Sequence, residues 1–269
     1  MKLGCNTVIF SKLDLDGALQ HIAWAGFQGA ELCHQDEWAR HIELDTNQAY
    51  IDKDKETARK YGLELFAIQI GLGPVRNDEN FKLMTKALDV AAKLSIAVVT
   101  MRAFGKADDR EITKEEFKFI KKVCDQAESR GVILGVKPHG GASVYNAATV
   151  FQMVDEVNSP NLGVTIDPLH LTRGGSDPAD TVLKLGKKIV HTHFHDCPPP
   201  QNYPETTEQQ TPGRSNIDWI KLLQNLKDVG YKGALDVHVI GACSYPVSRQ
   251  MGIAAEAKGY LSRCLLDLK

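Results

Sequence analysis

The sequence predicts a single domain, a (β/α)₈ barrel that spans residues 1–269. Short apolar segments alternate with longer amphipathic segments along the whole chain, which is typical of a parallel sheet built from βαβ units. Eight such units in 269 residues match the usual size of this barrel. No glycine-rich phosphate-binding loop follows any of the expected strands, and this disfavours the competing open, doubly wound α/β sheet.

Eight segments have the length and composition of buried strands. In chain order they are residues 2–6, 29–34, 63–70, 96–104, 132–139, 162–167, 189–196 and 233–240. Between them, apolar residues recur with helical spacing. The clearest amphipathic helices are expected at residues 15–24, 81–94, 114–130 and 217–229. Thr113 followed by Glu116 predicts a capping box at the start of the third of these helices.

Composition argues against several classes of protein. The net charge of −2 provides no positive field for binding nucleic acid. The sequence has no apolar run of the roughly 18 residues that a membrane span needs, and its N-terminus has no signal-peptide pattern. The six cysteines contain no CxxC pair. We expect a cytoplasmic protein with reduced thiols and no nucleic-acid or membrane partner. A homo-oligomer is compatible with the sequence, which leaves the oligomeric state open.

Polar and ionisable residues gather where the expected strands end. In such barrels the active site lies at the carboxyl ends of the strands. These ends carry Glu31, His34, Gln69, Arg102, Lys137, His139, Asp167, His170, His191, His193, His195, Asp196, Asp236 and His238. Seven of the nine histidines of the chain are among them. Because histidine is the commonest metal ligand and general base, we expect metal or proton-transfer chemistry at this rim.

Three of these residues suit a divalent ion. Asp167, His193 and His238 come from three neighbouring strands, so they would direct one carboxylate and two imidazoles to one point. That set of donors suits a divalent transition metal. Positive charge for holding substrate hydroxyls, a carboxylate or a phosphate would come from Arg102 and Arg214.

Two loops are expected near the same rim. The segment 197–215 is rich in proline, glutamine and threonine, and loops of this length inside compact domains tend to be functional. We interpret it as a loop over the mouth of the barrel. Trp38 follows the second strand and either lines the mouth of the pocket or covers core residues.

Several segments resemble the xylose-isomerase-like barrels, often described as sugar phosphate isomerases and epimerases. They are GFQGAEL (26–32), LGVTIDPLH (162–170), HTHFHD (191–196), PGRSNIDW (212–219) and GYKGALDVH (230–238). The resemblance extends over the whole chain and implies the same barrel fold. Members of that family typically bind one divalent ion through a Glu, an Asp, a His and a second Glu at the ends of strands five to eight. The two glutamates commonly act as acid and base as well.

The resemblance carries over only in part. Asp167 matches the aspartate, His193 matches the histidine, and Arg214 matches the arginine of the family's Pro-Gly-Arg-Gly turn. Lys137 stands in place of the first glutamate, and His238 stands in place of the second. An ammonium group has no lone pair to offer a metal and repels a cation. A divalent ion (Mn, Zn, Co, Fe or Mg) is still expected, but these two replacements should make its affinity weaker than in the family.

The favoured function is a sugar isomerase or epimerase that moves a proton next to the carbonyl of a carbohydrate or keto-sugar. Catalytic roles are expected for Lys137, His238, His193 and Glu31, and substrate contacts for Arg102, His139, His170, His195, Arg214 and Trp38. Three alternatives remain open. They are a keto-sugar lyase or dehydratase, a Schiff-base enzyme that uses Lys137, and a sugar-binding barrel that has lost its metal and has no catalytic function.

Overall fold

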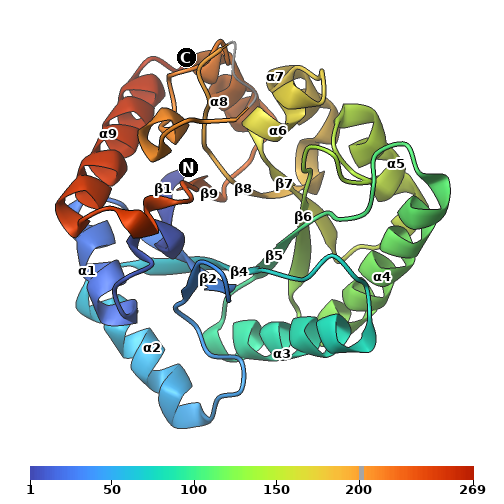
Figure 1. Cartoon of the computed structure of the whole chain (residues 1–269), viewed down its shortest axis with the longest axis horizontal. Coiled ribbons are helices and arrows are strands. Elements are labelled where there is room, and N and C mark those ends of the chain that lie inside the picture. The colour runs from blue at the N-terminus through green and yellow to red at the C-terminus, as the bar shows by residue number, and fades with distance from the viewer. Residues whose placement is uncertain (200–202) are drawn as a thin grey trace.

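The computed structural model describes residues 1–199 and 203–269. Its eight main strands are β1 (Lys2–Asn6), β2 (Gly29–Gln35), β4 (Glu64–Ile70), β5 (Val98–Arg102), β6 (Ile133–Lys137), β7 (Leu162–Ile166), β8 (Ile189–Thr192) and β9 (Ala234–Val237). They pair in parallel in the order β8-β7-β6-β5-β4-β2-β1-β9. A parallel bridge between Phe194 and Val237 joins the two ends of this sheet, so the strands form a nearly closed barrel (Figure 1).

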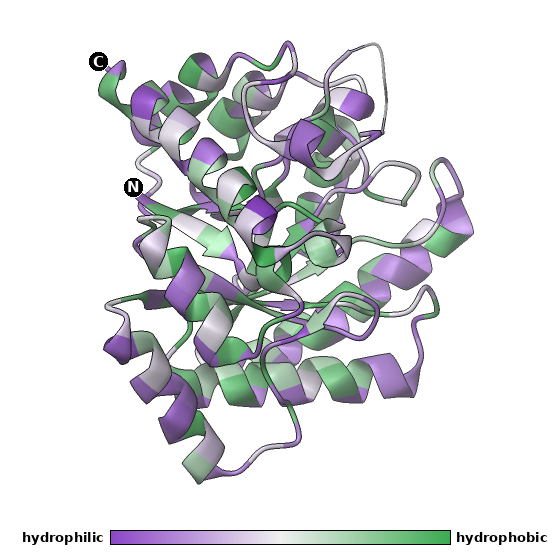
Figure 2. Cartoon of the chain, turned by 60° about the vertical axis from the view of Figure 1, so that its left-hand side comes forward, coloured by the Kyte–Doolittle hydropathy of each residue, from purple (hydrophilic) through white to green (hydrophobic). Residues whose placement is uncertain are grey.

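Helices surround the barrel (Figure 1). They are α1 (Leu15–Trp24), α2 (Gln48–Lys60), α3 (Asp78–Leu94), α4 (Arg110–Glu128), α5 (Ala147–Val157), α6 (Pro168–Arg173), α7 (Pro178–Leu185), α8 (Trp219–Asp228) and α9 (Val247–Leu266). Short 3₁₀ turns are η1 (Thr7–Phe10), η2 (Gly186–Lys188), η3 (Thr207–Gln210) and η4 (Ala242–Ser244), and a two-residue strand β3 (Ala39–Arg40) pairs antiparallel with β2. The outer helices carry both hydrophilic and hydrophobic residues along their length (Figure 2), as amphipathic helices do. The prediction of a (β/α)₈ barrel is confirmed.

The predicted start of α4 is wrong. Its N-cap is Asp109, whose side chain accepts a hydrogen bond from the backbone N–H of Ile112 at 3.2 Å. Thr113 therefore lies inside the helix, and its hydroxyl donates to the carbonyl oxygen of Asp109 at 2.7 Å. Glu116 forms a buried ion pair with Arg76 at 2.6 Å. Aspartate is a stronger N-cap than threonine, which explains why the helix begins before the expected capping box.

Several strands end earlier than expected. The segment expected as strand 189–196 is regular only to Thr192, because the following residues alternate between two neighbours. The backbone N–H of His193 donates to Ile166 on β7, at 2.8 Å, and that of Phe194 donates to Asp236 on β9, at 2.7 Å. Many of the ionisable residues of the rim therefore lie just beyond the regular strands.

A large apolar core lies between the sheet and the helices, whereas the barrel interior contains buried polar side chains. The interior also contains the ring of Phe66, over two glycines. A Cβ atom built on Gly29 would lie 2.4 Å from this ring, and one on Gly4 would lie 3.0 Å from it. Glycine at these positions therefore makes room for the ring. Within the described residues, no helix has both the length and the apolar character needed to cross a bilayer.

Candidate active site

Six imidazoles form an unbroken series of ring contacts at the carboxyl ends of β6 to β9. Along the series, the ring centroids are separated by 4.2 Å (His139–His170), 5.5 Å (His170–His195), 5.9 Å (His195–His238), 4.3 Å (His238–His193) and 5.5 Å (His193–His191). The rings of His193 and His238 are stacked, with 8° between their planes. These six strand-end histidines therefore lie at one rim, as expected. The residues that each of them contacts differ from those expected.

Asp167 is the centre of an outer polar group. It caps α6 and is fully buried. Its carboxylate lies 3.2 Å from Nζ of Lys137 and 2.9 Å from Nε2 of His195. Burial alone would raise the pKa of Asp167, but the nearby charges of His195, His170 and Lys137 hold it well below its ordinary value. This group therefore combines an ionised carboxylate with a fixed ammonium.

Glu31 is the centre of an inner polar group. Its carboxylate accepts hydrogen bonds from Nδ2 of Asn6 at 2.5 Å and from the hydroxyl of Thr100 at 2.6 Å. Nε2 of His193 lies 2.7 Å from it. Burial opposes the ionisation of Glu31, but His193 and His191 outweigh it and hold its pKa well below the ordinary value. Since an ionised carboxylate only accepts hydrogen bonds, Nε2 of His193 carries a proton and donates it to this bond.

Asp236 lies beside Glu31 in the barrel interior. Burial, followed by the charge of Glu31, raises the pKa of Asp236 well above its ordinary value. No N–H or hydroxyl group of the described residues donates to either of its oxygens. With its pKa raised, Asp236 is a protonated carboxyl group that donates its hydrogen bond to the carboxylate of Glu31.

The hydrogen bonds around His238 determine its tautomer. The carbonyl oxygen of the Asn6 side chain accepts from the backbone N–H of Val8 at 2.9 Å, so the nitrogen of that amide faces Gln69. Oε1 of Gln69 accepts from this nitrogen at 2.8 Å, and Nε2 of His238 lies 3.2 Å from the same oxygen. Because Oε1 only accepts, Nε2 of His238 is the protonated nitrogen. Nδ1 of His238 then carries a lone pair, and it has no hydrogen-bond partner in the described chain.

Several of these histidines are neutral at pH 7. Burial lowers the pKa of His238 well below 6.5, and the charge of Lys137 acts in the same direction. Burial lowers the pKa of His193 to about 4 despite the opposing charge of Glu31. Burial also lowers the pKa of His139 to about 4, and Lys137 and Arg102 act in the same direction. Neutral imidazoles have a lone pair available to accept a proton.

Arg102 and His139 form the more exposed edge of the site. Nη1 of Arg102 lies 3.5 Å from Nε2 of His139, and its guanidinium group lies 3.9 Å from the ring centroid of Phe104. Nδ1 of His139 donates to the carbonyl oxygen of Gly140 at 3.1 Å. This arrangement leaves other donors of Arg102 available to a ligand at the mouth.

Arg214 lies in a turn whose backbone is held by Asp196, and its side chain points toward α9 and not toward the other residues of the site. One carboxylate oxygen of Asp196 accepts from the backbone N–H groups of residues 213, 214 and 215, and from the indole N–H of Trp219. The guanidinium of Arg214 pairs with Glu256 on α9 at 2.5 Å. Asp196 therefore shapes the loop after β8, while Arg214 is placed at an ion pair on the outer surface.

Trp38 is half-buried and packs against a small cluster of Val8, Cys33 and Ala39, together with Ile240. The position of His34 is also structural, since its Nδ1 bonds to the carbonyl oxygen of Ile42 at 2.7 Å. Trp38 thus covers apolar residues beside the end of β2.

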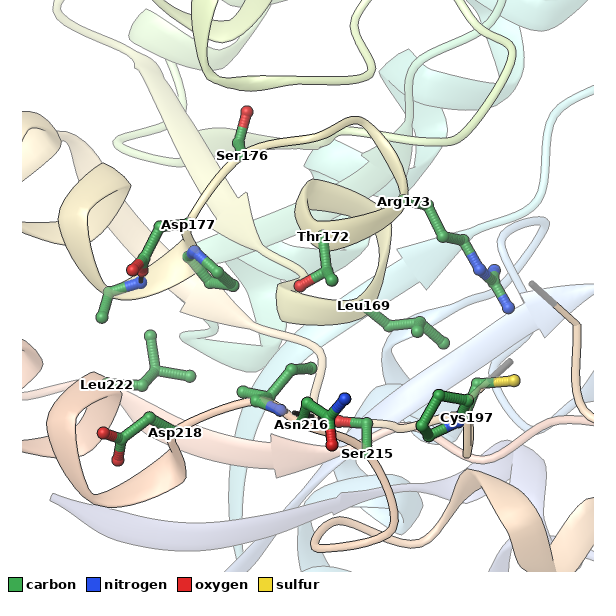
Figure 3. A pocket seen from close by; sticks show the side chains of 14 residues that line it. Leu169, Thr172, Arg173, Ser176, Asp177, Cys197, Ser215, Asn216, Asp218 and Leu222 are labelled. Carbon is green, nitrogen blue, oxygen red and sulfur yellow. Dashed lines mark hydrogen bonds between the residues drawn. The ribbon is translucent and has the colours of Figure 1, made fainter. Parts of the chain in front are cut away.

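A pocket of about 410 Å³ lies between α6 and the segment before α8 (Figure 3). Leu169, Thr172 and Arg173 reach it from α6, and Ser215, Asn216 and Asp218 reach it from the segment before α8. Nε and Nη2 of Arg173 are buried and have no hydrogen-bond partner in the described residues. Arg173 lies past the strand end, inside α6, where position in the sequence does not mark a residue as part of the site.

The donors expected to hold a metal are divided between the two polar groups. Within the described residues, one set of three close ligand atoms comes from Asp167, His170 and His195, and the other comes from Glu31, His191 and His193. His238 belongs to neither set. The family's four ligand positions also do not fit a divalent ion here, because Lys137 places an ammonium 3.2 Å from Asp167 and offers no lone pair.

The roles of Asn6, Gln69 and Thr100 were not foreseen. Each is a polar residue near the carboxyl end of its strand, in β1, β4 and β5, and each hydrogen bonds within or next to the inner group. The one feature of the sequence that indicated these three residues was their position near the carboxyl ends of strands. It could not show which carboxylate or imidazole each residue would meet.

The chain belongs to the xylose isomerase-like TIM barrel family, because the model of that family matches residues 19–263. Its curated relatives are distant. An uncharacterised protein of Methanocaldococcus jannaschii, MJ1311, is 26% identical over 88% of this chain and 83% of its own length. An inosose isomerase of Bacillus licheniformis is 28% identical over 64% of this chain and 63% of its own length, so the chain covers less than two thirds of that relative.

Two further comparisons extend this picture. A 3-dehydroshikimate dehydratase of Bacillus anthracis is 24% identical over 62% of this chain and 60% of its own length. Among solved structures, a D-tagatose 3-epimerase-like protein superimposes with a TM-score of 0.77 at 22% identity, over 98% of this chain and 97% of its own. At this identity the structural likeness establishes the fold alone.

Proposed function

We propose that this chain is an isomerase or epimerase of a keto-sugar or a similar polyhydroxy ketone, and that it moves a proton on the carbon next to the carbonyl. The observation that carries the proposal is the unpaired lone pair on Nδ1 of His238, at the same rim as the buried ammonium of Lys137. Abstraction of such a proton needs a base near the carbon and positive charge near the oxygen of the developing enolate.

In the proposed reaction, His238 is the base. Nδ1 of His238 takes the proton from the carbon next to the carbonyl, and the electron pair of the broken C–H bond moves onto the carbonyl oxygen. The ammonium of Lys137 stabilises the resulting negative charge. Return of the proton by Nδ1 to the neighbouring carbon, with a hydroxyl proton moving between the oxygens, gives the isomer. Epimerisation needs a proton delivered to the opposite face of the same carbon by a second acid, and we assign this role to the ammonium of Lys137. No step of this scheme passes through a metal.

The remaining residues position these two groups. Asp167 holds Lys137, and His193 stacks on the ring of His238 while Glu31 orients His193. We assign contacts with substrate hydroxyls to Arg102, His139, His170 and His195 at the mouth. Trp38 and Arg214 lie against apolar residues and Glu256, respectively, so any contact of theirs with substrate requires a rearrangement.

A lyase or dehydratase remains the second candidate, favoured by the similarity to the 3-dehydroshikimate dehydratase. It would share the first step, because loss of a hydroxyl next to the enolate also begins with removal of a proton beside a carbonyl. The product distinguishes the two reactions, since only elimination creates a new carbon–carbon double bond. A Schiff base at Lys137 is disfavoured because its amine is already engaged in an ion pair with Asp167 at 3.2 Å.

The test is exchange of hydrogen with solvent. Wild-type protein is incubated in D₂O with a panel of ketoses and cyclic polyhydroxy ketones, and proton NMR follows the signal of the carbon-bound hydrogen next to each carbonyl. We expect deuterium to enter at that position for at least one compound. His238→Gln keeps a donor for Gln69 but removes the base, so exchange should fall at least 100-fold, within the usual contribution of a general base.

His41→Gln is the matched control. His41 is also buried, with Nε2 bonded to the carbonyl oxygen of Leu13 and Nδ1 unpartnered within the described residues, but it lies outside the rim. This variant should exchange at the wild-type rate. Binding of a ketose by the wild type without any exchange would instead identify a sugar-binding protein and refute the proposal. Borohydride trapping of a ketose on Lys137 would move the assignment to Schiff-base chemistry.

A further inference from the structure

The inner group has the donors of a metal site that is not the site of the family. Glu31, His191 and His193 offer one ligand atom each, and these three atoms all lie within 4.8 Å of one another. Glu31 is 0% exposed, and each of the two histidines is 1% exposed. Only His193 stands at a position that the family uses for its ion. Carboxylate and imidazole donors in a set of three are typical of zinc and related transition metals.

The polar atoms of this group are arranged so that a cation fits among them. Nε2 of His191 lies 3.5 Å from Oε1 of Glu31 and makes no hydrogen bond with the described residues. Asp236 is 0% exposed, and within the described chain its carboxyl group faces the carboxylate of Glu31 while no N–H or hydroxyl donates to its oxygens. Two buried carboxyl groups in contact cannot both ionise without a large cost, and a divalent cation beside them would remove this cost.

The backbone makes room for the second carboxylate. Asp236 is paired with Gly4 in the register of β9 and β1, and a Cβ atom on Gly4 would lie 2.5 Å from Oδ1 of Asp236. A larger residue at position 4 would therefore displace the carboxyl group. The space for Asp236 next to Glu31 depends on this glycine.

The inner group and the position that the family uses for its metal differ in net charge. Glu31 and Asp236, when both are ionised, carry two negative charges, which balance a divalent cation beside two neutral imidazoles. At the family's position, the positive charge of Lys137 cancels that of Asp167. The inner group is therefore the better electrostatic match for an ion of charge +2.

We propose that Glu31, His191 and His193 bind one divalent transition-metal ion of the zinc or cobalt type, and that the carboxylate of Asp236 balances its charge. The proton on Nε2 of His193 moves to Nδ1, which has no other partner in the described chain, so that Nε2 offers its lone pair. Asp236 releases its proton to solvent as the ion binds. This inference does not depend on the proposed sugar chemistry.

The experiment uses Co²⁺ with the full chain, after treatment with a chelator and dialysis. Equilibrium dialysis with elemental analysis gives the stoichiometry and affinity, and the visible absorption of Co²⁺ reports its coordination. We expect one Co²⁺ per chain. His191→Gln and Asp236→Asn should each weaken binding at least tenfold, which is the usual minimum for loss of a supporting group at a metal site.

His195→Gln is the matched control, because it removes an imidazole from the outer carboxylate group and leaves the inner group intact. It should change the affinity less than threefold. Circular dichroism verifies that each variant is folded, and the nearly isosteric Asp236→Asn remains informative if His191→Gln does not fold. The inference is overturned if the wild type binds no Co²⁺ at millimolar concentration. It is equally overturned if His195→Gln abolishes binding while Asp236→Asn retains it.

Discussion

At the scale of single residues, a short chain of hydrogen bonds fixes the chemistry of His238. The backbone N–H of Val8 orients Asn6, Asn6 orients Gln69, and Gln69 leaves Nε2 of His238 as the protonated nitrogen. The lone pair on Nδ1, which we propose as the base, thus depends on a residue in η1, at the opposite end of the sequence. Buried imidazoles with lowered pKa values also make the free energy of unfolding depend on pH.

We expect the protein to lose stability as the pH falls from about 7 to 4. Burial lowers the pKa of His139 to about 4 and also lowers that of His41, whereas unfolded histidine titrates near 6.5. Between these values the unfolded chain binds more protons than the folded one, so the free energy of unfolding rises with pH. Each fully effective histidine would contribute on the order of 1 kcal/mol between pH 7.5 and 5, allowing for partial exposure to solvent.

Urea unfolding at pH 7.5 and at pH 5.0 measures this effect. His139→Asn should reduce the difference between the two pH values, because asparagine does not titrate. An identical difference in wild type and variant would show that His139 titrates normally in the folded protein.

Sequence patterns located the residues of the rim but not their partners. Alternation along strands and the positions of strand ends were sufficient to place Lys137, the strand-end histidines, Glu31 and Asp167 at one end of the barrel. They could not predict that Asp167 meets His195 while His193 turns to Glu31. Those pairings depend on the register between strands, which shifts between Val164 and Thr165 in the β7–β8 pair, and on the need of each buried carboxylate for donors.

At the scale of elements, the joint between β8 and β9 is held by a side chain as well as by backbone bonds. The hydroxyl of Thr192 donates to the carbonyl oxygen of Ala234 at 3.1 Å and accepts from the backbone N–H of Asp236 at 3.0 Å. It thereby joins two strands that the sheet does not otherwise pair along their length. This joint also positions Asp236 on β9 and His238 directly after its end.

Thr192→Val should therefore destabilise the barrel. Valine keeps the shape of threonine but leaves the N–H of Asp236 without its acceptor, whereas the carbonyl oxygen of Ala234 still accepts from the hydroxyl of Tyr231 at 2.8 Å, so we expect a loss of about 1–3 kcal/mol. Chemical denaturation measures the free energy of unfolding. The control is Thr165→Val, because the buried hydroxyl of Thr165 has no partner among the described residues and its loss should be nearly neutral. Equal losses in both variants would contradict the role of Thr192.

At the scale of the whole molecule, a standard barrel carries an altered set of polar groups. The alternation of strands and helices is sufficient to predict the (β/α)₈ fold, because each strand needs a helix to cover its outer face. The interior is less predictable, since polar groups there are satisfied by partners from strands far apart in the sequence. The resemblance to the family implies that Lys137 and His238 stand where its members have glutamates, which would replace two carboxylates by a cation and an imidazole.

The central claim is that Lys137 supplies the positive charge for proton transfer next to a carbonyl. The most direct test compares Lys137→Met with the wild type in the deuterium-exchange assay, on the ketose that the wild type exchanges fastest. Lys221→Met is the control, because Lys221 also pairs with aspartates but lies on the surface. We expect kcat/KM for exchange to fall about 100-fold or more in Lys137→Met, as for loss of one oxyanion-stabilising group, and to be unchanged in the control. Exchange by folded Lys137→Met within threefold of the wild-type rate would contradict the claim.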